Sequence, residues 1–216
     1  FITLDFGTNR MQPVFFPENS PTETTWTDPA LRMIAGWLNP DAADQLLELC
    51  LHTIDWEHPW INVYGRRIRQ PRLIAWYGDP QAVYSYSGIR LNPRPWPEFL
   101  LALKNRMETT LERKGWFNAV LLNLYRNGRD SVSWHCDNES AMGADPVLAS
   151  VSVGAPRDFV LRRKQNRTHR LKLTLEHGSL LYMGPGVQID WEHALPRRAR
   201  IEQPRVNLTF RRIVAS

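Results

Sequence analysis

From residue 117 onward, short β-strand-like stretches alternate with turn-forming glycines, and this spacing restricts the fold more than any other feature. The turns contain Gly128, Gly154, Gly178, Gly184 and Gly186. The expected strands are 117–125, 147–153, 158–163, 170–175, 179–183, 187–192 and 205–213. So many short strands at close spacing predict an antiparallel sandwich or barrel.

Two helices are expected ahead of this β-core. Asn39 and Pro40 are typical of an N-cap followed by the first helical residue, and apolar residues at helical spacing continue to Ile54. A second helix is predicted from about Pro97 to Lys114, with Gly115 as its stop. Residues 1–35 are expected to form an extended N-terminal arm, and 36–216 a single domain. The predicted fold class is α+β, with helices backing a C-terminal β-core.

Composition excludes several classes of protein. No apolar run approaches the roughly 20 residues that a membrane span needs. The first ten residues show no charged start followed by an apolar stretch, so no signal peptide is expected. The two cysteines, Cys50 and Cys136, argue against a disulfide scaffold and favour a reducing cytoplasm.

Positive charge is concentrated in the later part of the chain. The formal net charge is +5, but residues 1–60 have nine acids and two bases, and the remainder has 25 bases and 13 acids. One basic cluster comprises Arg66, Arg67, Arg69 and Arg72. The other, in 157–172, comprises Arg157, Arg162, Arg163, Lys164, Arg167, Arg170 and Lys172. Such clusters attract phosphate backbones, although a solvated basic surface would look the same.

A candidate metal site begins in the segment 134–139, Trp-His-Cys-Asp-Asn-Glu. Side chains alternate along an extended segment, so His135 and Asp137 should project to one side. His193 follows 56 residues later, near the end of another expected strand. Two histidines and one carboxylate on one side of a metal leave positions open for O₂ and a bidentate co-substrate, as in non-haem iron(II) oxygenases. A His-x-Asp pair also occurs by chance, so this motif alone is a weak signal.

The segment 205–211 adds a second polar feature. Its strict alternation places Arg205, Asn207, Thr209 and Arg211 on one face, and apolar residues on the other. Two guanidinium groups facing one way suit a dicarboxylate, because each can bind a carboxylate through paired hydrogen bonds. The alternative is an exposed amphipathic strand with its arginines in water. It does not explain why Asn123 and Tyr125 repeat the polar pattern on a second strand.

Together these motifs resemble the AlkB family of nucleic-acid dealkylases, closest to the branch that repairs double-stranded DNA. The resemblance covers about residues 55–213. It rests on 123–125 (Asn-Leu-Tyr), 135–137 (His-Cys-Asp), His193, 205–211 (Arg-Val-Asn-Leu-Thr-Phe-Arg) and 150–159 (Ser-Val-Ser-Val-Gly-Ala-Pro-Arg-Asp-Phe). It implies a double-stranded β-helix, or jelly-roll, core under a nucleotide-recognition lid at 56–96. Iron(II) would bind His135, Asp137 and His193, and 2-oxoglutarate would bind Asn123, Tyr125, Arg205, Thr209 and Arg211.

The resemblance also assigns residues to substrate binding. In 84–88, Tyr-Ser-Tyr-Ser-Gly, Tyr86 would stack on the target base, Tyr84 would line the pocket, and Ser87 lies beside them. Tyr64 and Gly65 match a loop with which duplex-acting members wedge an aromatic ring into the gap left by the flipped base. Arg66 and its neighbour Arg67 would contact flanking phosphates, and the 157–172 cluster would add Arg157 and Arg162. A solvent-exposed hairpin tip with an ordinary tyrosine is the structural alternative.

Two residues after Asp137 depart from the family's pattern. The branch carries consecutive acids where this sequence has Asn138 and Glu139. Glu139 stands at the position whose carboxylate meets the alkylated base, which is cationic in N1-methyladenine and N3-methylcytosine. Asn138 puts the second acid's role in doubt. Cys136 should point away from the metal by parity, as a core residue or one supporting the ligands.

The implied reaction is oxidative demethylation of alkylated bases in DNA, with duplex as the expected form. It would consume 2-oxoglutarate and O₂ and release succinate, CO₂ and formaldehyde. The chain is expected to act as a monomer. Two alternatives remain open at this point: an RNA demethylase or protein hydroxylase on the same core, and a binding module without catalysis.

Overall fold

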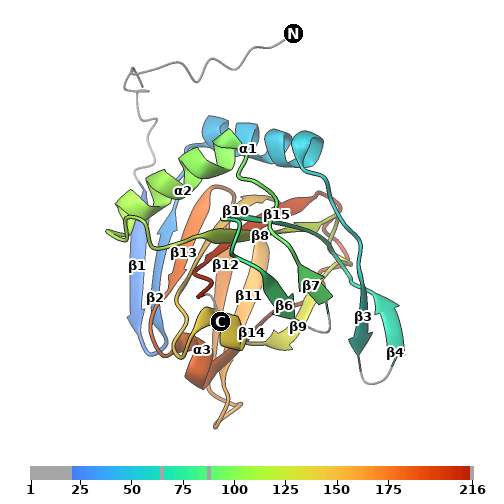
Figure 1. Ribbon diagram of the computed structural model, residues 1–216. Helices are drawn as coiled ribbons and strands as arrows, with labels where there is room; N and C mark the ends of the chain where they lie inside the picture. Colours follow the sequence, from blue (N-terminus) through green and yellow to red (C-terminus); the bar gives the residue numbers. More distant parts are fainter. Residues whose placement is uncertain (1–20, 64–65, 87–88, 215–216) are drawn as a thin grey trace.

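Two antiparallel sheets face each other in the computed structural model, which describes residues 21–63, 66–86 and 89–214 (Figure 1). The larger sheet has the order β1 (Thr22–Thr27), β2 (Ala30–Ala35), β13 (Ser179–Met183), β10 (Leu148–Gly154), β15 (Arg205–Arg211), β8 (Ala119–Tyr125) and β5 (Leu73–Gly78). The smaller sheet has the order β12 (Arg170–Leu175), β11 (Arg157–Arg163), β14 (Trp191–Leu195) and β9 (Val132–His135). This arrangement fits the antiparallel sandwich predicted from the many short strands and the jelly-roll implied by the family resemblance.

Two helices cover the outer face of the larger sheet, as the sequence predicted (Figure 1). These are α1 (Pro40–Thr53) and α2 (Glu98–Thr110). At the start of α1 the side chain of Asn39 accepts a hydrogen bond from the amide of Ala42, 2.8 Å away, and Pro40 takes the first helical position. Leu46 and Cys50 of α1 pack into the core shared with the sheet. A second apolar cluster fills the space between the two sheets.

Part of the predicted arm belongs to the larger sheet. Residues 22–35 form β1 and β2, and β2 pairs with β13. Leu31 and Ile34 of β2 are buried there, whereas β1 is largely exposed. Assigning 22–35 to an extended arm is therefore wrong. The sequence did not predict β1 as a strand because its residues are mostly polar, and an edge strand buries little of its own surface.

Other boundaries also differ from the prediction. The segment 187–192, predicted as one strand, forms the short helix α3 (Val187–Asp190) and the start of β14. Gly186 precedes the helix with a φ of 81°, a left-handed conformation that reverses the chain and that glycine adopts readily. A 3₁₀ turn, Ser140–Met142, lies between β9 and β10. None of the helices within the described ranges combines the length and apolar character needed to cross a bilayer.

Two short hairpins stand outside both sheets, within the 56–96 segment. They are β3 (Trp60–Val63) with β4 (Arg66–Arg69), and β6 (Tyr84–Tyr86) with β7 (Ile89–Leu91). In Figure 1 the first hairpin projects on the right of the molecule, and the second lies in front of the sandwich near β9.

Candidate metal centre and its pocket

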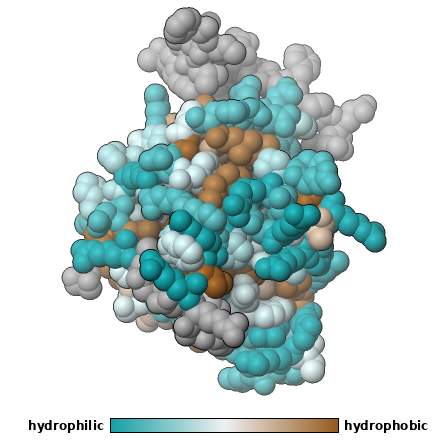
Figure 2. Space-filling view, turned by 90° about the vertical axis from the view of Figure 1, so that its right-hand side faces the viewer, coloured by the Kyte–Doolittle hydropathy of each residue, from teal (hydrophilic) through white to brown (hydrophobic). Residues whose placement is uncertain are grey.

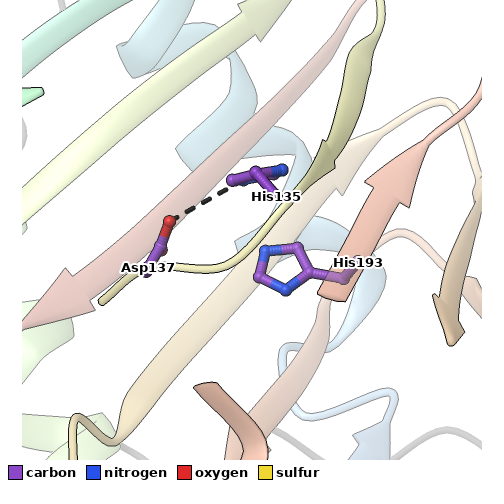
Figure 3. Close-up of side chains that lie close together, drawn as sticks. All are labelled: His135, Asp137 and His193. Atoms are coloured by element: carbon purple, nitrogen blue, oxygen red, sulfur yellow. Dashed lines mark ion pairs between the residues drawn. The ribbon is translucent and has the colours of Figure 1, made fainter. Parts of the chain in front are cut away.

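Three potential metal ligands meet on the inner side of the smaller sheet. His135 ends β9, Asp137 follows two residues later, and His193 lies in β14, directly across from His135 in the strand register. One ligand atom from each residue lies within 4.8 Å of the others (Figure 3). The two imidazole rings have their centroids 4.3 Å apart. The predicted convergence of these three side chains is thus present in the fold.

The Asp137 carboxylate is held in its charged form. Burial alone would raise the pKa of this carboxyl, but the Arg211 guanidinium holds it well below its usual value. Arg211 Nη2 donates to Asp137 Oδ2 at 2.7 Å. The backbone amide of Asp137 donates to Gln188 Oε1 at 2.9 Å. A carboxylate that is ionised and fixed from two sides is suited to bind a cation.

Both histidines leave a ring nitrogen for a ligand. His135 Nδ1 lies 2.8 Å from the carbonyl oxygen of Ser133 and donates to it, which leaves Nε2 as the ring nitrogen that can face a ligand. His135 Nε2 lies 3.7 Å from Asp137 Oδ1. Burial lowers the pKa of His193 to about 3, and the neighbouring His135 adds to this effect, so the ring is neutral at pH 7. The buried Nδ1 of His193 has no hydrogen-bond partner among the described residues. This donor set fits a divalent transition metal.

The metal ligands lie in a cavity of about 720 Å³ between the sheets. The polar face of β15 forms one wall with Arg205, Asn207, Thr209 and Arg211. The opposite face of β15 packs Val206, Leu208 and Phe210 into the core beneath the helices. Both arginines are buried, at 2% and 4% exposure. The alternative of an exposed amphipathic strand is therefore wrong.

Arg205 is a buried cation without a carboxylate partner among the described residues. It donates to Ser152 Oγ at 2.9 Å, and its guanidinium lies over the ring of Tyr125, 5.3 Å from the centroid. Its buried Nε has no hydrogen-bond partner within the described ranges. Burial lowers the pKa of Arg205 to about 10, which still leaves it charged at pH 7. A buried and uncompensated guanidinium in the wall of a cavity fits a carboxylate ligand.

The remaining polar residues of the wall are already hydrogen-bonded to one another. Asn207 donates to Ser150 Oγ and accepts from Thr209 Oγ1 at 2.8 Å. Asn123 Oδ1 accepts from Arg72 Nε at 2.7 Å. These bonds hold the amides in place, so Asn207 and Asn123 line a rigid wall.

The cavity is also lined by Tyr84 and Glu139, both of which the resemblance assigns to substrate binding. Tyr84 is buried and stacks on Trp76, with ring centroids 5.0 Å apart. Burial, followed by the nearby Asp137 carboxylate, raises the pKa of Glu139. Asn138 is exposed and does not line the cavity. Cys136 is half-buried at the cavity and is not part of the group of metal ligands.

Arg157 does not have the predicted position. Only 1% of it is exposed, and its Nη2 donates to the carbonyls of Asp130 and Pro196 at 2.9 and 2.8 Å. Its assignment to substrate binding is wrong, because alternation along β11 turns this guanidinium into the fold. Arg162 instead pairs with Glu192 at 2.5 Å and lies over the ring of Trp134.

The other substrate residues predicted from the resemblance fall wholly or partly outside the described residues. Tyr64, Gly65 and Ser87 lie outside the described residues, and so do the side chains of Arg66 and Tyr86.

Sequence reasoning missed two residues that support the site. Arg72 was seen only as part of a basic cluster, yet it is buried and holds Asn123. Gln188, fully buried, holds the amide of Asp137 from α3. No pattern marks Gln188, because a single glutamine in a segment read as a strand gives no sign of its partner.

Comparison with known proteins gives consistent matches. The 2OG-Fe(II) oxygenase superfamily matches residues 30–211. Alpha-ketoglutarate-dependent dioxygenase alkB homolog 3 of Homo sapiens is 40% identical over 187 residues, covering 82% of this chain and 64% of that protein. DNA oxidative demethylase ALKBH2 of Mus musculus is 41% identical over 162 residues, covering 71% and 66%. The chain therefore spans somewhat less than two thirds of the length of these relatives.

A solved structure shows the same fold. The structure of OsALKBH1 superimposes with a TM-score of 0.58, at 15% identity, over 85% of this chain and 97% of that one. At this identity the likeness concerns the fold alone.

Proposed function

This chain belongs to the 2OG-Fe(II) oxygenase superfamily and, within it, to the AlkB family, and from this premise we propose that it oxidatively demethylates alkylated bases in DNA. The observation that carries the proposal is the shared cavity. A His–Asp–His group and a strand bearing two buried arginines line the same cavity. The names of two relatives, a dioxygenase and a DNA oxidative demethylase, agree with this reading.

The residues of the cavity divide into two sets. His135, Asp137 and His193 would hold iron(II), and the buried polar wall would hold 2-oxoglutarate through Asn123, Tyr125, Arg205, Thr209 and Arg211. Bound iron(II) with 2-oxoglutarate and O₂ supplies the oxidation that hydroxylates an N-methyl group, which then leaves as formaldehyde. The protein contributes position and the exclusion of water. Arg211 connects the two sets, because it lies on β15 with Arg205 and donates a hydrogen bond to Asp137.

The acids near Tyr84 suit a cationic base. N1-methyladenine and N3-methylcytosine carry a positive charge that is lost on demethylation. Glu139 lines the cavity beside Asp137, and its half-buried carboxylate would attract that charge. Tyr84, stacked on Trp76, offers an aromatic wall for the base.

Duplex DNA is the substrate form we favour. The 56–96 segment would act as the recognition lid, with Tyr86 stacking on the flipped base and Ser87 beside it. Tyr64 and Gly65 would fill the gap in the duplex, and Arg66 would contact a phosphate. Asn138, which is exposed and does not line the cavity, is left out of the contacts we propose inside it. We further propose that a monomer suffices for activity in the cytoplasm.

A product assay tests the function directly. The chain, supplied with iron(II) and 2-oxoglutarate, should release formaldehyde and restore adenine in oligonucleotides that contain N1-methyladenine. His135→Ala combined with His193→Ala should abolish both signals. Persistent turnover in that double variant would refute the metal assignment. A preference for methylated RNA, or for a peptide, would replace DNA by one of the alternative substrates. Metal-independent, salt-sensitive binding without any turnover would indicate a binding module.

A further inference from the structure

The β3–β4 hairpin has two chemically different faces. In its register Trp60 pairs with Arg69, and Ile61 pairs with Ile68. Because side chains alternate along a strand, Trp60, Arg67 and Arg69 share one face and the two isoleucines share the other. Ile61 and Ile68 line the cavity that contains the metal ligands, whereas the other three do not. The face with Trp60 is therefore the outer face of the hairpin.

The outer face holds two positive charges on one aromatic ring. The guanidinium carbons of Arg67 and Arg69 lie 5.3 and 4.5 Å from the ring centroid of Trp60. Trp60 is 45% exposed, and both arginines are exposed. Figure 2, which views the side on which the hairpin lies, shows a largely hydrophilic surface with smaller hydrophobic patches. Stacking on the ring restrains two long side chains that would otherwise sample many rotamers.

These two charges are not neutralised within the described part of the chain. No ion pair joins Arg67 or Arg69 to a carboxylate there, although Arg69 donates to the carbonyl of His58. Nearby Arg94, by contrast, pairs with both Asp55 and Glu57. A restrained and uncompensated pair of guanidinium groups is suited to phosphate oxygens, which each group can bind through paired N–H donors.

We propose that the outer face, formed by Trp60, Arg67 and Arg69, binds the phosphodiester backbone of the DNA strand that does not enter the cavity. This inference rests on the proposed function. A strand that delivers its base to the cavity passes the isoleucine face, which leaves the complementary strand within reach of the outer face. Arg67 and Arg69 are two positions apart on β4, about 7 Å along the strand. That spacing exceeds the roughly 3.4 Å axial rise between phosphates of one strand, so each guanidinium can meet its own phosphate.

Binding to duplex and single-stranded oligonucleotides across a salt series tests the inference. Fluorescence anisotropy would compare wild type with the double variant Arg67→Gln and Arg69→Gln. Loss of two phosphate contacts should lower the slope of log affinity against log salt by about 2, and duplex affinity roughly tenfold at moderate salt. Single-strand affinity should change by less than about twofold, since the outer face would have no strand to bind.

Trp60→Ala provides a second variant that removes no charge. It should also weaken duplex binding, because the arginines lose the ring that holds them, whereas Trp60→Phe should keep most of the affinity. Unchanged duplex affinity in Trp60→Ala would show that the ring has no role in binding. Thermal melting of each variant checks that the fold is intact.

Arg212→Gln is the matched control. Arg212 also stacks on an indole, that of Trp116, with 4.4 Å to the ring centroid. Trp116 belongs to the segment between α2 and β8, on the left in Figure 1, whereas the hairpin lies on the right. An equal loss of duplex affinity in Arg212→Gln would overturn the proposal. So would a double variant that loses as much affinity for single strands as for duplex, or one whose salt slope is unchanged. Wild-type turnover of single-stranded N1-methyladenine DNA tests the proposed function separately, since that reaction does not need the outer face.

Discussion

Gln188 illustrates how one buried side chain can support a metal ligand without touching the metal. Its side-chain Oε1 accepts a hydrogen bond from the backbone amide of Asp137, and its backbone carbonyl accepts one from Lys164 Nζ at 2.8 Å. The residue is fully buried on α3, so the backbone between the two ligands of the His-x-Asp motif is tied to a separate element. Such outer contacts commonly change metal affinity when they are removed.

Gln188→Met should therefore weaken metal binding. The methionine fills a similar volume but cannot accept the Asp137 amide, so we expect roughly a 10- to 100-fold loss of affinity for manganese(II) or iron(II). Titration of the metal-free protein with manganese(II), followed by electron paramagnetic resonance, measures this directly. Gln45→Met, at an exposed position on α1, serves as the control. Equal affinities in the two variants would show that Gln188 does not position Asp137.

Arg205 should strengthen the binding of 2-oxoglutarate and lower the stability of the fold without that ligand. Replacing it by Met removes a buried guanidinium with an unpartnered Nε. We expect 2-oxoglutarate to bind at least about 30-fold more weakly, because a charge-assisted hydrogen bond contributes about 2 kcal/mol. The melting temperature without 2-oxoglutarate should stay equal or rise, since the buried charge is no longer desolvated. Calorimetric titration of the manganese-loaded protein measures the affinity.

Arg163→Met is the control for Arg205→Met, because Arg163 pairs with Asp28 at the surface. Tight 2-oxoglutarate binding by the Arg205 variant would remove this residue from the proposed ligand set.

At the scale of elements, α2 ends earlier than its sequence predicts. The predicted end was Lys114, but the helix stops at Thr110, and Glu112 adopts a φ of 55°. Glu108 explains the early end. Its carboxylate accepts the amides of Gly115 and Phe117 at 2.9 and 2.8 Å and also pairs with Lys104. One buried acid thus turns the chain from helix α2 into strand β8.

Glu108→Ala should destabilise the fold severely. Lys104 would become a buried cation without a partner, and two amides would lose their acceptor, for a cost of about 3 kcal/mol or more. For a domain of this size, that corresponds to a fall in melting temperature of roughly 10 °C. Glu48→Ala removes a comparable i,i+4 partner, that of His52, at the exposed surface and should change the melting temperature little. Similar melting curves for both variants would contradict this role of Glu108.

At the scale of the whole molecule, β15 joins the two cores. Its apolar face packs beneath the helices, and its polar face lines the cavity with the metal ligands. The sandwich places this strand in the centre of the larger sheet, between β10 and β8. A central strand has no edge exposed to water, so the site stands on a rigid part of the fold.

The sequence by itself determined which residues share a face. Alternation along 205–211 separated the polar wall from the core, and the spacing of His135 and Asp137 placed both ligands on one side. These predictions succeeded because a strand's period of two is a local property that needs no knowledge of its neighbours. The number and spacing of the strands predicted an antiparallel sandwich or barrel, and the family resemblance narrowed this to a jelly-roll.

Only the tertiary structure decided what each face meets. Arg157 belongs to a basic cluster in the sequence but is enclosed by the carbonyls of Asp130 and Pro196. Gln188 reaches Asp137 across 51 positions of the chain, and β2 contributes to the core only because β13 offers it an edge. Burial and hydrogen-bond partners depend on sheet order and register, which bring distant segments together and leave no periodic trace in either one.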